Sequence, residues 1–312
     1  MEMRKLGKSG PDISVIGYGA WEAGGEVWGD EPEEKALNAM EAAIDSGMNW
    51  IDTAEVYGGG RSEEVVGRFL NGRRDQILVF TKVAPDGTGL RRGEVRKALE
   101  GSLRRLRTDY VDLYQIHWPP SPDVPAEEFW GEMAELQDEG LTRFIGVSNF
   151  DRELIEQCMA IRNVDSVQNQ FSLLVQQDRG ELLPWLDEQG IGYLAYGPLS
   201  YGLLTGAITK DTKFADDDWR SGKKWKMGYY DLLFKPGTFE RNIDLVERLK
   251  PIADRVGCEV SSLALRAAVD VKGVTAAIAG SRNADHVRSN ASAGDLQLDE
   301  KTRDEIYENF GK

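Results

Sequence analysis

The sequence predicts an α/β fold, a (β/α)8 TIM barrel formed by one domain over residues 1–312. Short apolar runs alternate with stretches of helical spacing, eight such runs occur, and the chain is long enough for a barrel of this type. Strands that alternate with helices pair in parallel, and eight of them close into a barrel more readily than into an open sheet. The runs are Ile16–Ala20, Met48–Asp52, Ile77–Thr81, Val111–Ile116, Phe144–Val147, Ser166–Asn169, Ile191–Tyr196 and Ala276–Ala279.

The stretches between the runs carry apolar side chains on one helical face. Between residues 95 and 106, apolar residues recur at i, i+4, i+8 and i+11, and the stretch 245–256 repeats this type of spacing. Residues 154–159 form a third such stretch, which follows the capping residues in 148–151. Each stretch predicts an amphipathic helix that packs against the barrel.

Two segments add to the eight repeating units. Residues 3–15 hold a Ser-Gly-Pro-Asp turn between short extended pieces, which predicts an N-terminal β-hairpin over the bottom of the barrel. Residues 200–238, after the seventh strand, form a long polar insertion. A loop in this place lies on the active-site face, and we expect it to be mobile.

Composition limits the kind of partner. Lys and Arg total 38 and Asp and Glu total 53, so the formal net charge is −15, which disfavours nucleic acid and anionic membranes. Residues 1–10 lack the apolar core of a signal peptide, and no run of 18 apolar residues occurs. The two cysteines, Cys158 and Cys258, fit neither a disulfide framework nor a zinc site. We therefore expect a cytoplasmic protein, and nothing in the sequence indicates its oligomeric state.

Polar side chains gather where three successive strands end. Asp52 ends the second strand, Tyr57 lies in the next loop, Lys82 ends the third strand, and His117 follows the fourth. Barrel active sites lie at the C-terminal ends of the strands, so we expect these four side chains to converge. Tyrosine is a poor acid–base group at neutral pH unless a cation stabilises its phenolate. Lys82 could supply that cation, Asp52 could keep it charged, and His117 could hydrogen-bond a substrate carbonyl.

Long motifs around these residues resemble those of the aldo-keto reductases. Residues 47–58, GMNWIDTAEVYG, are similar to the first signature of that family, and residues 102–119, SLRRLRTDYVDLYQIHWP, are similar to the second. Residues 80–82, FTK, look like its catalytic-lysine strand. The resemblance covers nearly the whole chain, and it is closest to the branch of bacterial general stress and inositol-pathway reductases. It implies a catalytic tetrad of Asp52, Tyr57, Lys82 and His117, the same set that the strand ends indicate.

The resemblance also implies a site for a nicotinamide dinucleotide. The nicotinamide end falls on Ser148, Asn149, Gln170 and Tyr196. The pyrophosphate loop falls on Pro198, Leu199, Gly202, Leu203 and Gly206. The adenosine end falls on Gly280, Ser281, Arg282, His286 and Asn290. An arginine beside a helix N-terminus suits a 2′-phosphate, so we expect NADPH, with NADH the less favoured cofactor.

These assignments predict an NAD(P)H-dependent oxidoreductase. It would reduce small aldehydes or ketones to alcohols by hydride transfer, with Tyr57 as general acid and no metal ion. Aromatic residues on the rim loops could line the substrate pocket. The candidates are Trp21, Trp28 and Trp118, with Trp225 and Tyr229 as further possibilities.

Two other classes of function stay open at this point. Some members of the resembled family serve as channel subunits, which leaves a regulatory subunit that binds NADPH with little turnover. A metal-dependent barrel hydrolase is disfavoured, because the chain has two histidines and only His117 ends a strand on the active face.

Overall fold

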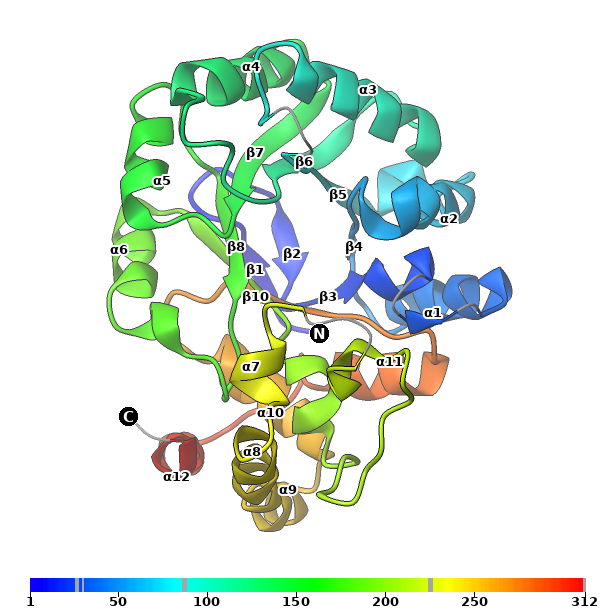
Figure 1. The fold of residues 1–312 in the computed structure, drawn as a ribbon, viewed down its shortest axis with the longest axis vertical. Helices are drawn as coiled ribbons and strands as arrows, with labels where there is room; N and C mark the ends of the chain where they lie inside the picture. Colours follow the sequence, from blue (N-terminus) through cyan, green and yellow to red (C-terminus); the bar gives the residue numbers. More distant parts are fainter. Residues whose placement is uncertain (26–27, 30, 86–88, 224–226, 311–312) are drawn as a thin grey trace.

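In the computed structural model, which describes residues 1–25, 28–29, 31–85, 89–223 and 227–310, eight parallel strands close into a barrel (Figure 1). The strands follow chain order around the barrel, and the last of them pairs with the first. Every predicted run forms one strand, which confirms the (β/α)8 barrel. The strands are β3 (Ile16–Gly19), β4 (Trp50–Asp52), β5 (Leu78–Val83), β6 (Val111–Ile116), β7 (Thr142–Ser148), β8 (Ser166–Gln170), β9 (Gly192–Tyr196) and β10 (Ala276–Ala279).

Strand alternation brings the catalytic candidates into the barrel. Trp50 and Phe80 belong to the apolar cluster inside the barrel, and their ring centroids lie 5.0 Å apart. Side chains two residues apart on a strand share one face. Asp52 and Lys82 therefore point inward from the same face, one layer closer to the C-terminal ends of β4 and β5. The interior is thus apolar at one end and carries charge at the other.

The predicted N-terminal hairpin closes the apolar end. Strands β1 (Met3–Lys5) and β2 (Asp12–Ser14) pair antiparallel, and Leu6 and Ile13 are fully buried against the barrel interior. The indole N–H of Trp50 donates to the Ser14 carbonyl at 2.8 Å. Gly17 leaves the room for that indole, because a Cβ at this position would lie 2.1 Å from the ring.

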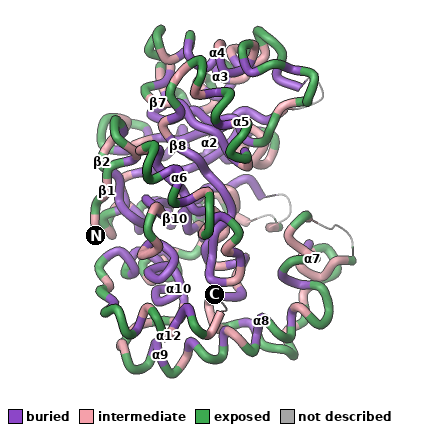
Figure 2. The backbone as a smooth tube through the Cα atoms, turned by 90° about the vertical axis from the view of Figure 1, so that its left-hand side faces the viewer, coloured by how far each residue is buried: buried purple, intermediate pink, exposed green. Residues whose placement is uncertain are grey.

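Helices surround the barrel, and their buried residues pack with those of the strands in one large apolar cluster (Figures 1 and 2). Asp151 caps α5 by accepting the N–H of Leu154 at 2.9 Å, as its position predicts. No helix in the described part of the chain has both the length and the apolar character that a membrane crossing needs. The helices are α1 (Glu33–Asp45), α2 (Arg61–Phe69), α3 (Glu94–Leu106), α4 (Ala126–Asp138), α5 (Arg152–Met159), α6 (Leu182–Gln189), α10 (Val260–Val269), α11 (Ala284–Ser292) and α12 (Glu300–Phe310).

The stretch 245–256 does not form the single helix that its spacing predicts. Helix α8 (Thr238–Glu247) ends before Pro251, and α9 (Lys250–Val256) begins with Pro251 in its first turn. Proline has no N–H to donate to the carbonyl four residues earlier, and its ring clashes there. The apolar periodicity continues across the break because both helices face the same cluster.

The insertion after β9 has an apolar core of its own, although its sequence reads as a polar loop. It contains the 3-10 turns η6 (Ser200–Thr205) and η7 (Trp219–Ser221) and the short helix α7 (Tyr230–Leu233). Trp219 is fully buried in a cluster that α8 completes. The prediction of a polar mobile loop missed this packing, because the buried residues are spread along the segment without helical or strand spacing. Within the insertion they are Leu203, Ile208, Trp219, Leu233 and Phe234, and Val175 together with Phe239 and Ile243 of α8 completes the cluster.

Candidate active site

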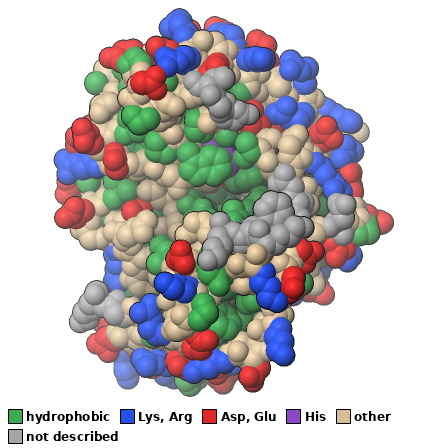
Figure 3. Space-filling model, viewed as in Figure 1, with side chains coloured by type: hydrophobic (Ala, Val, Ile, Leu, Met, Phe, Trp, Pro, Cys, Tyr) green, Lys and Arg blue, Asp and Glu red, His purple; other side chains and the backbone are tan. Residues whose placement is uncertain are grey.

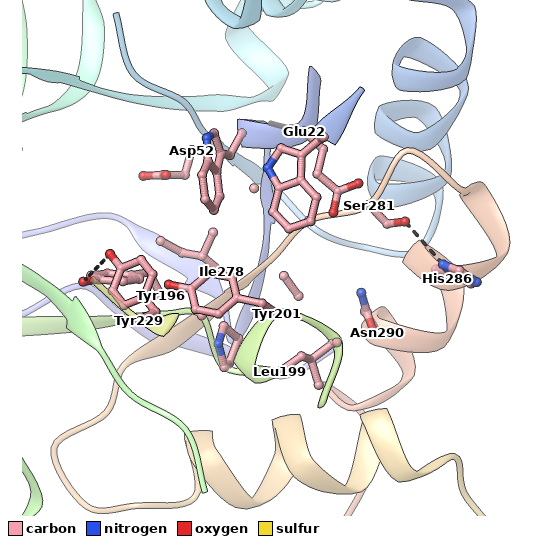
Figure 4. A pocket seen from close by; sticks show the side chains of 18 of the residues that line it. Glu22, Asp52, Tyr196, Leu199, Tyr201, Tyr229, Ile278, Ser281, His286 and Asn290 are labelled. Carbon is pink, nitrogen blue, oxygen red and sulfur yellow. Dashed lines mark hydrogen bonds between the residues drawn. The ribbon is translucent and has the colours of Figure 1, made fainter. Parts of the chain in front are cut away.

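A cavity of about 820 Å³ lies at the C-terminal ends of the strands. Its wall draws on the strand ends, the loop after β3, the insertion after β9 and helix α11. Figure 3 shows apolar side chains gathered at the centre of this face, and Figure 4 shows the wall from close by. The charged end of the barrel interior therefore opens into a large cavity with several aromatic side chains in its wall.

Asp52 and Lys82 form a buried ion pair at the base of this cavity. Lys82 is fully buried, and its Nζ donates to Asp52 Oδ1 at 2.6 Å and to the Thr53 carbonyl at 2.8 Å. The second carboxylate oxygen accepts from Gln168 Nε2 at 2.9 Å. Burial lowers the pKa of Lys82, and Asp52 opposes that shift. Gln168, on β8, was not among the predicted site residues, and only its inward register on the strand could have suggested it.

Tyr57 lies above this pair in the turn η3 (Tyr57–Gly60) and lines the cavity. Its ring centroid is 5.2 Å from Lys82 Nζ and 5.6 Å from the centroid of the His117 ring. Burial raises the pKa of Tyr57 well above 10, and the charge of Asp52 raises it further. The phenol therefore keeps its proton at neutral pH, as a proton donor requires.

His117 follows β6 and is nearly buried. Its ring stacks on Trp118 at 3.8 Å between centroids, and its Nδ1 has no hydrogen-bond partner among the described residues. Burial lowers the pKa of His117 well below 6.5, and the positive charge of Lys82 adds to the shift. The imidazole is therefore neutral at physiological pH and can donate one N–H to a ligand in the cavity.

Neutral His117 makes the stability of the fold depend on pH. Below pH 6.5 the unfolded chain protonates this histidine while the folded chain does not, so stability falls as the pH drops. His117→Gln should remove about 1 kcal/mol of the loss between pH 6.5 and 5.5, measured by urea unfolding at both pH values. His286→Gln, at the exposed second histidine, is the control. An unchanged pH dependence in His117→Gln would contradict a buried neutral His117.

Ser148 and Asn149 belong to a hydrogen-bond network beside the four predicted catalytic residues. Ser148 Oγ donates to the Gln168 carbonyl at 2.7 Å, and Asn149 Nδ2 donates to the His117 carbonyl at 2.9 Å. Asn149 adopts a positive φ of 61°, which asparagine tolerates better than most residues. Its Oδ1 accepts from Tyr196 OH at 2.7 Å. This network fixes the Tyr196 ring at the wall of the cavity.

The structure separates the remaining predicted cofactor residues into two groups. Those that line the cavity are Pro198, Leu199, Gly202, Gly280, Ser281, His286 and Asn290. Those outside the described lining are Gln170, Leu203, Gly206 and Arg282. On β8 the lining residue is Gln168, two positions before Gln170 on the same face of the strand.

The far end of the cavity meets the turn between β10 and α11. Ser281 Oγ lies 3.5 Å from His286 Nδ1, and both face the cavity with Asn290 (Figure 4). The guanidinium of Arg282 donates to the carbonyls of Gly29 at 2.7 Å and of Trp28 at 2.5 Å. Arg282 thus lies outside the cavity lining, and its hydrogen bonds connect the loop after β3 to the turn before α11.

Aromatic side chains wall the catalytic end. Trp21 packs edge-on against Trp28 at 5.1 Å and lies 6.1 Å from Tyr57, between ring centroids. Trp118 is 40% exposed at the mouth. The three predicted pocket residues Trp21, Trp28 and Trp118 all line the cavity, as does Tyr229, whereas Trp225 lies outside the described residues. Among the residues described, no three His, Cys, Asp or Glu side chains gather where they could hold a metal ion.

The sequence profile of the aldo/keto reductase family matches residues 15–308 of the chain. The chain belongs to the aldo/keto reductase family. It is 37% identical to the aldo-keto reductase YhdN of Bacillus subtilis, over 90% of this chain and 85% of the relative. It is 30% identical to the NADH-specific methylglyoxal reductase of Escherichia coli, over 96% of this chain and 95% of the relative. It is 32% identical to a probable voltage-gated potassium channel subunit beta of Oryza sativa, over 95% of this chain and 92% of the relative.

Solved structures agree with this membership. The glycerol dehydrogenase AKR11B4 from Gluconobacter oxydans superimposes with a TM-score of 0.84 and 31% identity, over 98% of this chain and 94% of the other. An aldo/keto reductase from Klebsiella pneumoniae in complex with NADP and acetate superimposes with a TM-score of 0.74 and 28% identity, over 97% of this chain and 94% of the other. This aldo/keto reductase is therefore an NAD(P)H-dependent oxidoreductase, and carbonyl reduction is the reaction that its family supports.

Proposed function

We propose that this aldo/keto reductase reduces aldehydes or ketones to alcohols with NADPH, and that Tyr57 donates the proton. One observation carries the proposal: the segments at and after the ends of β4, β5 and β6 bring a hydroxyl, a cation and a neutral imidazole together at one cavity. Lys82 Nζ lies 5.2 Å from the centre of the Tyr57 ring, and the His117 ring meets that ring edge-on at 5.6 Å. No other group of described residues combines these functions at a cavity of this size.

A bound nicotinamide cofactor would supply the hydride. The side chains of the protein would hold the carbonyl and deliver the proton. Neutral His117 can donate to the carbonyl oxygen and orient it. Tyr57 can then protonate the alkoxide, because an alkoxide is a stronger base than a phenolate. Lys82, held by Asp52, places a positive charge beside the phenolate that remains.

The wall of the cavity suits a dinucleotide along its whole length. At one end Tyr196 offers an aromatic face that Asn149 fixes in place. In the middle, Gly202 has a φ of 100°, and glycines in such conformations let backbone N–H groups approach phosphate oxygens. At the other end Ser281 reaches the cavity just before the N-terminus of α11, where an anion is favoured, and Asn290 reaches it from the last turn of that helix.

The choice of NADPH over NADH rests on Arg282. Arg282→Ala should weaken NADPH binding by about 10- to 100-fold and NADH binding by less than about twofold, since a charge-assisted hydrogen bond contributes about 1.5–3 kcal/mol. Quenching of the fluorescence of the eight tryptophans would report both titrations. Arg288→Ala, at an exposed arginine of the following helix α11, is the matched control. Equal weakening of both cofactors in Arg282→Ala would refute the 2′-phosphate assignment.

We propose a small carbonyl compound as the substrate. The walls at the catalytic end are Trp21, Trp28 and Trp118, and flat aromatic walls suit a planar or apolar molecule. The second candidate function is a regulatory subunit that binds NADPH with little turnover, which the likeness to a plant channel subunit brings into consideration. Purified protein that turns over aldehydes with NADPH and forms no stable hetero-complex would exclude it.

A further inference from the structure

Glu22 is a carboxylate in the cavity that the proposed reaction does not use. It lies in the 3-10 turn η1 (Trp21–Gly24) directly after β3, and its side chain is 26% exposed. In Figure 4 it stands next to Ser281, at the end of the cavity away from Tyr196 and Tyr229. A mostly buried acid at this place is unexpected, because the cavity suits an anionic dinucleotide.

The partners of Glu22 belong to the turn at Arg282. The backbone N–H of Arg282 donates to Glu22 Oε2 at 3.3 Å, and Arg282 Nε lies 4.0 Å from the same oxygen. The other donors of this guanidinium, Nη1 and Nη2, go to the carbonyls of Gly29 and Trp28. Glu22 thus lies against the backbone N–H and Nε of Arg282, the two nitrogens of this residue that do not donate to the carbonyls of Gly29 and Trp28.

The charge of Glu22 is only partly compensated. Burial is the largest influence on this carboxyl and raises its pKa. The charge and the backbone N–H of Arg282 oppose the rise without cancelling it. A negative group that arrived at Arg282 would therefore meet a carboxylate that is held weakly and would itself be repelled.

We propose that Glu22 competes with the 2′-phosphate of NADPH for Arg282 and so sets the preference of this enzyme between NADPH and NADH. The proposal rests on the proposed function, which assigns the 2′-phosphate to Arg282. Both anions would use the same two donors, the backbone N–H and Nε of Arg282. Glu22 must therefore move or take up a proton when NADPH binds, whereas NADH, which carries a hydroxyl in place of that phosphate, leaves it in place.

The isosteric variant Glu22→Gln tests the proposal. The Kd of NADPH should fall roughly tenfold and that of NADH should change less than about twofold, because a charge a few ångströms from the phosphate is removed within a partly screened site. Quenching of tryptophan fluorescence would give both values. Glu259→Gln removes another carboxylate from the wall of the same cavity, and it should move both Kd values by the same small factor.

Two further variants complete the design. In an Arg282→Ala background, Glu22→Gln should favour NADPH less than it does in the wild-type background, because the contested cation is gone and only the backbone N–H remains. Glu22→Ala should repeat the effect of Glu22→Gln, with thermal unfolding as the check that each variant is folded. Tightening of both cofactors alike, an unchanged NADPH Kd, or weaker NADPH binding would overturn the role of Glu22. If the wild-type protein bound neither cofactor, or if Arg282→Ala left NADPH binding intact, the proposed function itself would fail first.

Discussion

Replacing Tyr57 by phenylalanine should lower kcat for carbonyl reduction by about 10²- to 10⁴-fold, the range that a positioned general acid contributes. The substitution removes one hydroxyl. The ring contacts with Trp21 and His117 stay, so the fold and the cavity should be unchanged. Cofactor Kd should also stay within about twofold, since the lost group acts on the transition state and not on the bound ground state. Steady-state oxidation of NADPH with a saturating aldehyde measures the loss.

Tyr229→Phe is the matched control for that substitution. Tyr229 also lines the cavity, and its hydroxyl donates to Tyr196 OH at 3.1 Å. Its loss should lower kcat by less than about tenfold, because only one neutral hydrogen bond is removed. If Tyr57→Phe kept wild-type activity, or if the two variants lost activity equally, Tyr57 would not be the proton donor.

Lys82→Met should destabilise the fold by about 3–5 kcal/mol, the loss expected when one partner of a buried ion pair is removed. Lys82 is fully buried and Asp52 is 2% exposed, so water cannot replace the ammonium group. Gln168 still donates to Asp52 but brings no charge. Urea unfolding gives the change in free energy, and activity should fall to background at the same time.

The double variant Asp52→Asn/Lys82→Met separates stability from chemistry. It removes both charges, so it should regain a large part of the stability that Lys82→Met loses. Activity should stay at background, because the cation beside Tyr57 is absent. Additive losses of stability in the double variant would show that the two side chains do not stabilise each other, contrary to the 2.6 Å contact.

Much of this fold can be predicted from the sequence, because local sequence patterns mark the strands and the catalytic residues at their ends. Most strands of the barrel are short apolar runs, and Asp52 and Lys82 lie at the ends of two predicted ones, so the position of the active-site end follows from the pattern. The N-terminal hairpin can be predicted for the same reason, since its turn residues lie between two short extended segments.

Other features depend on contacts between distant segments, which no local pattern reveals. Gln168 reaches Asp52 across the barrel, and the two residues are 116 positions apart in the chain. The apolar core of the insertion needs α8 to complete it. Arg282 is drawn behind the wall of the cavity by the carbonyls of Trp28 and Gly29, whereas its sequence context suggests a free cation.

Conversion of NADPH and an aromatic aldehyde to the alcohol, with both products quantified in the same sample, tests the central claim most directly. The account predicts one alcohol formed for each NADPH oxidised in the wild-type protein, and alcohol formation at least about a hundredfold slower in Tyr57→Phe, although that variant still binds NADPH. NADPH binding without formation of alcohol by the wild-type protein, across a panel of aldehydes and ketones, would contradict a reductase and would favour the regulatory subunit.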